Sequence, residues 1–263
     1  MIAKLNKQYT EHSVFEQLTE FADFYKSLSE SAMNWVTHGT RDILNLDTYV
    51  YSSMQGTLES IHDILIKGRI NDSYSLLRKF YDSTIINVYS SLYLEDKCSL
   101  DIFYVAQIDK WIKGTDKLPK YGIMSQYIKD SPKLKAITDL LQQDQTYKDI
   151  RDRCNDHTHY NYYDNLMLND NQIYSPDRLM ALHTISSDLE LIIIQHLAYI
   201  FSINDHYMMS SDYTDSLVIG VTPEEDSQYW IAPFVQDMFD KLIKTKRPDV
   251  AEQLKGNTTM KLS

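Results

Sequence analysis

Glycine is scarce in this chain, and its scarcity constrains the fold more than any other sequence feature. Only 7 of the 263 residues are glycine, where average usage of about 7% would give roughly 18. Few residues can therefore form tight turns, which favours long helices over a turn-rich β architecture. The nearest two, Gly114 and Gly122, are too far apart for either glycine-rich phosphate-binding motif. Enzymes built on such nucleotide-binding loops are not expected.

Apolar residues recur at spacings of three and four along most of the chain, as in amphipathic helices. Gly68 is placed to end one helix, and Asn71 or Asp72 to cap the next, so these two helices are expected to be antiparallel neighbours. Proline in Ser131-Pro132 fits the first position of a further helix. The predicted helices cover residues of about 10–35, 42–67, 72–94, 100–113, 146–155, 176–203 and 230–244.

These patterns predict an all-α protein, an antiparallel helical bundle with an appended C-terminal helical segment. Residues 1–204 form the main bundle and carry the candidate site, and residues 205–263 form a loop and helix packed on it. The run Leu191–Ile194 is apolar all round, which predicts a central position in the bundle. Residues 255–263 are expected to be a frayed tail.

Charge and cysteine content limit the classes of partner and compartment. The net charge of −11 excludes broad coating of nucleic acid, so any contact with a polyanion must be local. Two cysteines without a C-x-x-C motif predict neither a disulfide framework nor a structural zinc site, and they fit a reducing, cytoplasmic setting. The longest charge-free, mostly apolar run has 13 residues, fewer than the roughly 20 that span a bilayer. No membrane contact is expected.

Two arginines and two histidines lie within nine residues of the segment 150–161. Each arginine has a histidine six positions later: Arg151 with His157, and Arg153 with His159. On a continuous helix such pairs are about 120° out of alignment, so they converge only if the helix loosens or ends there. Residues 155–158, rich in Asn, Asp and Thr, are consistent with such an ending.

Arginine and histidine together suffice for cleavage of RNA without a metal or another cofactor. A histidine would take the proton of the ribose 2′-hydroxyl, and an arginine would stabilise the charge that develops on the phosphate. The structural alternative is that both arginines are solvated cations near a helix end and both histidines cap the helix or edge the core.

In this helical context the segment resembles the HEPN superfamily, helical-bundle proteins of prokaryotic defence and toxin systems. Their signature is an arginine, four to six residues and a histidine, often with a polar residue directly after the arginine. Arg151-Asp152 with His157 has this form, whereas Arg153 with His159 has the spacing but a cysteine after the arginine. Residues 155–161 are also similar to an Asn-Asp-x-x-His-x-Asn stretch associated with this group, which favours His159. Both registers are kept as alternatives.

The resemblance, which covers residues of about 45–205, implies a metal-independent endoribonuclease of a bacterial defence or toxin system. It implies a homodimer that acts on RNA, needs no cofactor and is often restrained by an inhibitory partner protein. The implied catalytic residues are Arg151, His157, Arg153 and His159. Many members of the superfamily have lost catalysis, so the alternative is a non-catalytic HEPN-like interaction or regulatory protein that dimerises or binds a partner.

Several residues outside the motif are secondary candidates. Arg78 forms either an i,i+4 ion pair with Asp82 or a second phosphate contact, and Asn155 is the other candidate nucleic-acid contact. His183 and His196 are expected to be core histidines rather than metal ligands. Tyrosines crowd the stretch after the motif, where they could stack RNA bases or fill the rim of the core. These are Tyr160, Tyr162, Tyr163 and Tyr174.

Overall fold

A computed structural model describes residues 5–34, 46–97, 105–169, 177–227 and 230–263. The described residues form helices joined by short connections, and their one β-bridge, between Met209 and Ile231, is isolated. The predicted all-α fold is confirmed. The longer helices are α2 (Val14–Asn34), α3 (Leu46–Ile66), α4 (Ile70–Lys97), α8 (Thr146–Thr158) and α10 (Asp177–Ile203).

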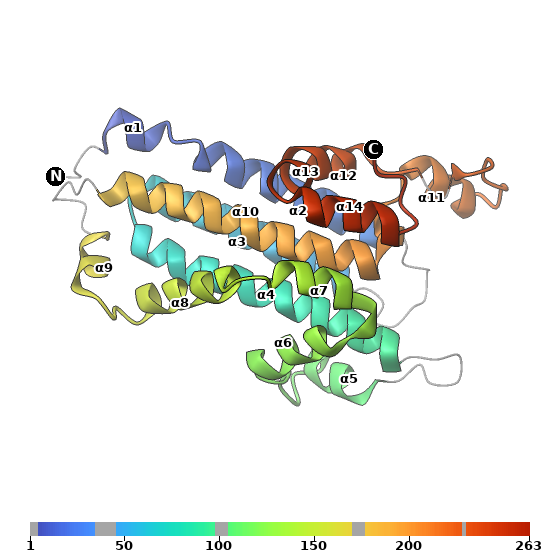
Figure 1. Ribbon diagram of the computed structural model, residues 1–263, viewed down its shortest axis with the longest axis horizontal. Coiled ribbons are helices and arrows are strands. Elements are labelled where there is room, and N and C mark those ends of the chain that lie inside the picture. Colours follow the sequence, from blue (N-terminus) through green and yellow to red (C-terminus); the bar gives the residue numbers. More distant parts are fainter. Residues whose placement is uncertain (1–4, 35–45, 98–104, 170–176, 228–229) are drawn as a thin grey trace.

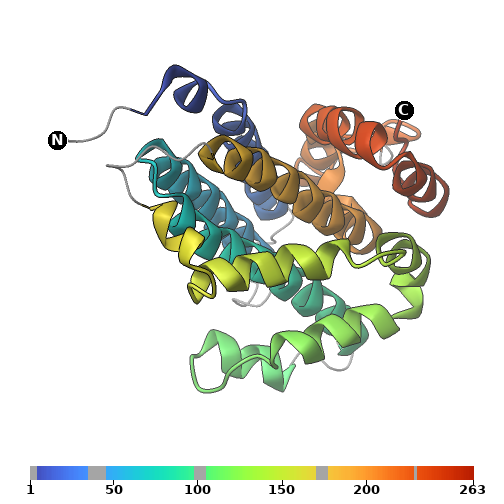
Figure 2. The same cartoon turned by 60° about the vertical axis from the view of Figure 1, so that its left-hand side comes forward.

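The long helices α2, α3, α4 and α10 run alongside one another, and α8 lies against α4 (Figures 1 and 2). Their facing stripes build one large hydrophobic core. The prediction for α10 is confirmed, because Ile192, Ile193 and Ile194 are fully buried. Short helices connect or flank the long ones: α1 (Lys7–Thr10), α5 (Ala106–Ile112), α6 (Tyr121–Asp130), η2 (Pro132–Leu134), α7 (Lys135–Leu141) and α9 (Tyr163–Met167).

The link between α3 and α4 follows the predicted glycine stop but not the predicted cap. Gly68 adopts a positive φ of 75° and donates its N–H to Leu65, as a helix C-terminus requires. Asn71 does not cap α4, because α4 begins one residue earlier and the Asn71 side chain points into the core. The cap comes from a distant residue: Asn169 Oδ1 accepts the N–H groups of Asn71 and Asp72, at 2.9 and 3.3 Å.

His196 is a satisfied core histidine, as predicted. Its Nδ1 lies 2.7 Å from the Tyr25 hydroxyl and its Nε2 lies 2.8 Å from Asn87 Oδ1. Burial lowers the pKa of His196 to about 3, so the ring is neutral. His183 differs, because it is exposed and its Nδ1 lies 3.1 Å from His12 Nε2.

The C-terminal segment is more ordered than the sequence indicates. Its elements are η3 (Asp205–Met208), α11 (Ser211–Val218), α12 (Pro233–Met238), the π-helical turn η5 (Phe239–Ile243), α13 (Lys244–Lys246) and α14 (Pro248–Asn257). Helix α12 begins at Pro233 rather than Trp230, because the residue before a proline avoids the helical conformation.

The prediction of a frayed tail at residues 255–263 is wrong. Helix α14 continues to Asn257, and after it Met260 and Leu262 are buried. Helices α12 to α14 pack beside α10, on the side away from α5 and α6 (Figure 2). Arg247 Nη2 also donates to the Leu140 carbonyl at 2.8 Å. Within the described ranges, every helix is too short or too polar to span a membrane.

Candidate functional site

Helix α8 carries the Arg/His motif and is longer than predicted. It runs unbroken to Thr158, three residues beyond the expected end at Asn155, and therefore includes His157. A continuous helix turns about 100° per residue, so residues six positions apart lie on different faces. Arg151 and His157 accordingly point to different neighbours, and His159 follows the helix as its C-cap. The convergence of each arginine with the histidine six positions later is not observed within this chain.

The inward face of α8 explains the position of His157. Ile150, Cys154 and His157 are buried at helical spacing. The His157 ring stacks on Tyr74, with ring centroids 3.7 Å apart and an interplanar angle of 6°. Its Nδ1 lies 2.8 Å from Asn71 Oδ1, and Asn71 Nδ2 donates to the His157 carbonyl at 3.1 Å. Burial lowers the pKa of His157 to about 4. His157 is therefore a neutral packing residue.

Arg153 lies beside this inward face and is bound to α10. Its Nε and Nη2 donate to the two carboxylate oxygens of Asp188, both at 2.9 Å. The Asp188 side chain is only 4% exposed, and burial raises the pKa of its carboxyl against the opposing effect of Arg153. A bidentate pair of this kind fixes the guanidinium. Arg153 therefore holds α8 to the core.

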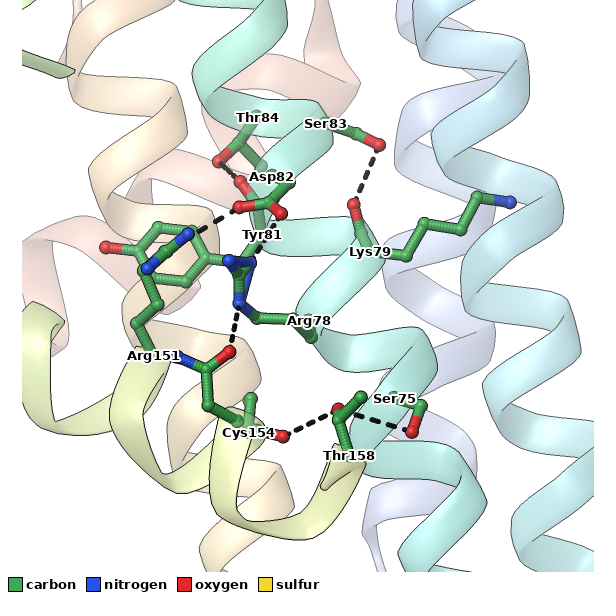
Figure 3. Close-up of polar contacts among 11 residues, drawn as sticks. Ser75, Arg78, Lys79, Tyr81, Asp82, Ser83, Thr84, Arg151, Cys154 and Thr158 are labelled. Carbon is green, nitrogen blue, oxygen red and sulfur yellow. Dashed lines mark hydrogen bonds and ion pairs between the residues drawn. The ribbon is translucent and has the colours of Figure 1, made fainter. Parts of the chain in front are cut away.

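The face of α8 that carries Arg151 meets α4 in an antiparallel ladder of polar pairs (Figure 3). Thr158 Oγ1 accepts from Ser75 Oγ at 3.3 Å, and Asn155 Oδ1 accepts from Arg78 Nε at 3.1 Å. One turn further, Arg151 Nε lies 3.8 Å from Asp82 Oδ1. Each step of three or four residues along α4 is matched by the same step back along α8. The ladder brings Arg78, Arg151 and Asn155 together, three of the six predicted site residues.

Arg78 and Arg151 share a single carboxylate and a single aromatic ring. Arg78 Nη1 is 2.5 Å from Asp82 Oδ2, and the predicted i,i+4 pair is thus confirmed. The Arg151 guanidinium carbon lies 3.6 Å from the centre of the Tyr121 ring, and that of Arg78 lies 5.7 Å from it. Burial raises the pKa of the Asp82 carboxyl, and both guanidiniums oppose this effect. Two arginines against one carboxylate leave one excess positive charge in a half-buried position.

His159 and its neighbours lie at the far end of α8, facing solvent. His159 is exposed, and so are Tyr160, Tyr162 and Tyr163, with 45%, 62% and 73% of their surfaces accessible. These tyrosines are available for contacts rather than filling the core. Tyr174, the fourth predicted stacking residue, lies outside the described residues.

The cluster formed by Arg78, Arg151, Asp82 and Tyr121 is called the arginine cluster. Its geometry and the roles of Asp82 and Tyr121 were not predicted from the sequence. Asp82 appeared only as the partner of Arg78, although it also faces Arg151. Tyr121 was not among the predicted site residues, although it begins α6 and its ring lies near both guanidiniums. The matched spacing of polar residues on α4 and α8 was the only signal that could have found the pairs. No three metal-ligating side chains gather in the part of the chain that the structure describes.

Comparisons of this chain with protein-family models, with curated proteins and with solved structures found no match. The resemblance to the HEPN superfamily therefore depends on the motif and its helical context.

Proposed function

We propose that this chain is a HEPN-like protein that binds RNA through the arginine pair of α4 and α8 and does not cleave it. The observation that carries the proposal is the convergence of Arg78 and Arg151 on Asp82 and Tyr121, with no histidine among them. Guanidinium groups bind phosphate oxygens through paired N–H donors. The histidine-based cleavage expected from the motif would need an imidazole beside them, and the nearby motif histidine, His157, is buried against Tyr74.

The local charge suits a single phosphate contact in an acidic protein. Arg151 Nε is buried 3.8 Å from Asp82 Oδ1 and makes no hydrogen bond among the described residues, so a phosphate would bind through the terminal nitrogens of this guanidinium. Asp82 neutralises only one of the two arginines, and a phosphate would balance the other. A net charge of −11 opposes coating of long RNA, so binding is restricted to a short single-stranded segment at this cluster.

The wider context of the proposal comes from the resemblance. The protein acts in the cytoplasm as a homodimer, as an interaction or regulatory subunit of a bacterial defence or toxin system. Its exposed tyrosines at the end of α8 contribute to the dimer contact or to RNA stacking.

Binding of a labelled single-stranded RNA, measured by fluorescence anisotropy, tests the proposal. The double variant Arg78→Gln/Arg151→Gln should weaken binding at least about 10-fold, because each charged hydrogen bond lost costs roughly 1.5 kcal/mol or more. Lys79→Gln is the matched control for the single variant Arg78→Gln, since it also removes one positive charge from α4, and Lys79 points away from the cluster (Figure 3). Equal binding by the wild type and the double variant would contradict the proposal.

A second candidate, the metal-independent endoribonuclease, is favoured by one observation. His159 is exposed at the end of α8, so a second copy of the chain could bring an arginine to it. Incubation with RNA in EDTA distinguishes the two functions. Cleavage that persists in EDTA and is lost in His159→Ala supports the ribonuclease, with Arg153 or Arg151 as the phosphate-holding residue. Binding without cleavage at any protein concentration supports the non-catalytic protein. An inhibitory partner protein is then not expected, because there is no nuclease activity to inhibit.

A further inference from the structure

A cleft opens beside Arg151, between α4, α6, α8 and α10. Its volume is about 370 Å³, within the range of small-molecule sites. Four tyrosines line it, one from each of these helices: Tyr81, Tyr121, Tyr147 and Tyr199. Aromatic walls with a few polar groups are typical of pockets that hold a planar ligand.

Two buried polar atoms of the lining have no partner. Gln195, on α10, is 5% exposed, and its Oε1 has no hydrogen-bond donor among the described residues. The Tyr147 hydroxyl is likewise buried and without a partner in the described part of the chain. A buried polar group without a hydrogen-bond partner destabilises the folded state. A ligand that supplies one donor and one acceptor would remove both costs.

Two other hydroxyl groups of the cleft already have hydrogen-bond partners. The Tyr81 hydroxyl donates to the Tyr147 carbonyl at 3.3 Å, and the Tyr199 hydroxyl accepts from Thr138 Oγ1 at 3.4 Å. The charged residues of the lining are three bases and two acids, namely Lys129, Lys148, Arg151, Asp144 and Asp152. The cleft thus contains two polar atoms without hydrogen-bond partners among the described residues and a lining with one more positive than negative charge.

We infer that this cleft is a subsite for one unpaired RNA base, whose own phosphate lies on Arg151. Every nucleobase carries an N–H donor and an acceptor on its edge, which match Gln195 Oε1 and the Tyr147 hydroxyl. The ring stacks against the tyrosines, as bases do in single-strand-binding proteins. The inference rests on the proposed function and adds to it the part of the RNA that is recognised.

Two oligonucleotides of equal length and charge test the subsite: a single-stranded RNA and its abasic counterpart. The wild type should bind the base-bearing RNA at least about 10-fold more tightly, from stacking and hydrogen bonding. Gln195→Leu should reduce that ratio about 5-fold, because one hydrogen bond is lost, and should leave abasic binding unchanged. Tyr147→Phe, which removes only the hydroxyl, should act in the same direction. Gln126→Leu is the control, since Gln126 is exposed on α6 outside the lining.

The outcomes separate the two proposals. Tight binding of both oligonucleotides, with equal affinity in the wild type and Gln195→Leu, would overturn the base subsite and leave phosphate binding by the arginines intact. Binding of neither would contradict the proposed function and the subsite with it. Unfolding of Gln195→Leu in urea provides a check on folding. Because Gln195 Oε1 has no partner, this variant should be at least as stable as the wild type.

Discussion

Two faces of α8 use the same residue type for different purposes. Arg153, which faces α10, is held by both oxygens of one buried carboxylate, Asp188. Arg151, on the face that meets α4, reaches Asp82 only at 3.8 Å and shares that carboxylate with Arg78. The first guanidinium has a complete partner and the second does not. The two arginines are two residues apart, which corresponds to a rotation of about 200° around the helix axis. Arg153 is therefore a structural residue, whereas the guanidinium of Arg151 is not fully paired.

The comparison also explains why the Arg/His signature is ambiguous in sequence. A spacing of six residues pairs an arginine on one face with a histidine on another when the helix continues. Here the helix continues to Thr158, so His157 joins the core and His159 reaches solvent. The signature describes the composition of the segment, whereas the length of the helix decides which side chains can act together.

The largest expected effect is on stability, and it distinguishes the two arginines. Arg153→Gln leaves the Asp188 carboxylate, 4% exposed, without its counter-charge. Breaking a buried pair costs roughly 3–5 kcal/mol, and partial exposure of Arg153 places the expected loss near the lower limit, about 3 kcal/mol. Arg151→Gln removes a longer ion pair and the stacking on Tyr121, and it should cost less, about 1–2 kcal/mol. Urea unfolding of both variants measures the difference.

The double variant Arg153→Gln/Asp188→Asn is the control for this prediction. It removes the uncompensated charge and should recover part of the lost stability. Equal losses in Arg153→Gln and Arg151→Gln would show that the two faces do not differ in this way.

The second largest expected effect is a dependence of folding stability on pH that is caused by protonation of His157. Its pKa is about 4 in the folded protein, compared with roughly 6.5 when unfolded. Between these values the unfolded chain binds more protons at this residue, so stability is complete above pH 6.5 and falls as the pH falls towards 4. From pH 7 to 5 His157 should contribute a loss of about 2 kcal/mol.

Urea unfolding of His157→Gln at several pH values measures this contribution. The variant should lose less stability than the wild type between pH 7 and 5, whatever its stability at pH 7. His159→Gln, which changes an exposed histidine of the same helix end, should keep the wild-type dependence. A His157→Gln protein with the wild-type dependence would mean that the ring is not buried as described.

The smallest effect concerns the cap that positions α4. Asn169→Ala removes the acceptor of the Asn71 and Asp72 N–H groups and should cost about 1 kcal/mol. Thermal unfolding measures it. Asn165→Ala, four residues earlier, provides a neighbouring control. An Asn169→Ala protein as stable as the wild type would show that the Asn169 side chain does not stabilise the start of α4.

Much of the fold could be predicted because it depends on local patterns. Apolar spacing located the long helices, and Gly68 and Gly114 end helices with the positive φ that suits glycine. Pro132 begins η2, as its position predicted. The cap of α4 could not be predicted, because Asn169 lies about a hundred residues away in sequence. The buried tail could not be predicted either, since Met260 and Leu262 depend on packing against distant helices.

The site was predicted in composition more than in arrangement. Arg78, Arg151 and Asn155 were singled out and lie together. Their common partner Asp82 and the ring of Tyr121 emerge only when α4, α6 and α8 are assembled. His157 and Arg153 were singled out for chemistry, but His157 is buried against Tyr74 and Arg153 is paired with the buried Asp188. A seven-residue motif does not specify burial or tertiary ion pairs.

The salt dependence of RNA binding by two single variants tests the central claim most directly. For single-stranded RNA, each phosphate contact contributes about 0.7 to the slope of log K against log salt concentration. Arg151→Gln should therefore bind more weakly and reduce the magnitude of this negative slope by about 0.7. Arg153→Gln, measured at a temperature where it is folded, should keep the affinity and slope of the wild type. Equal loss in both variants, or loss in Arg153→Gln alone, would contradict the assignment of phosphate binding to the face of α8 that carries Arg151.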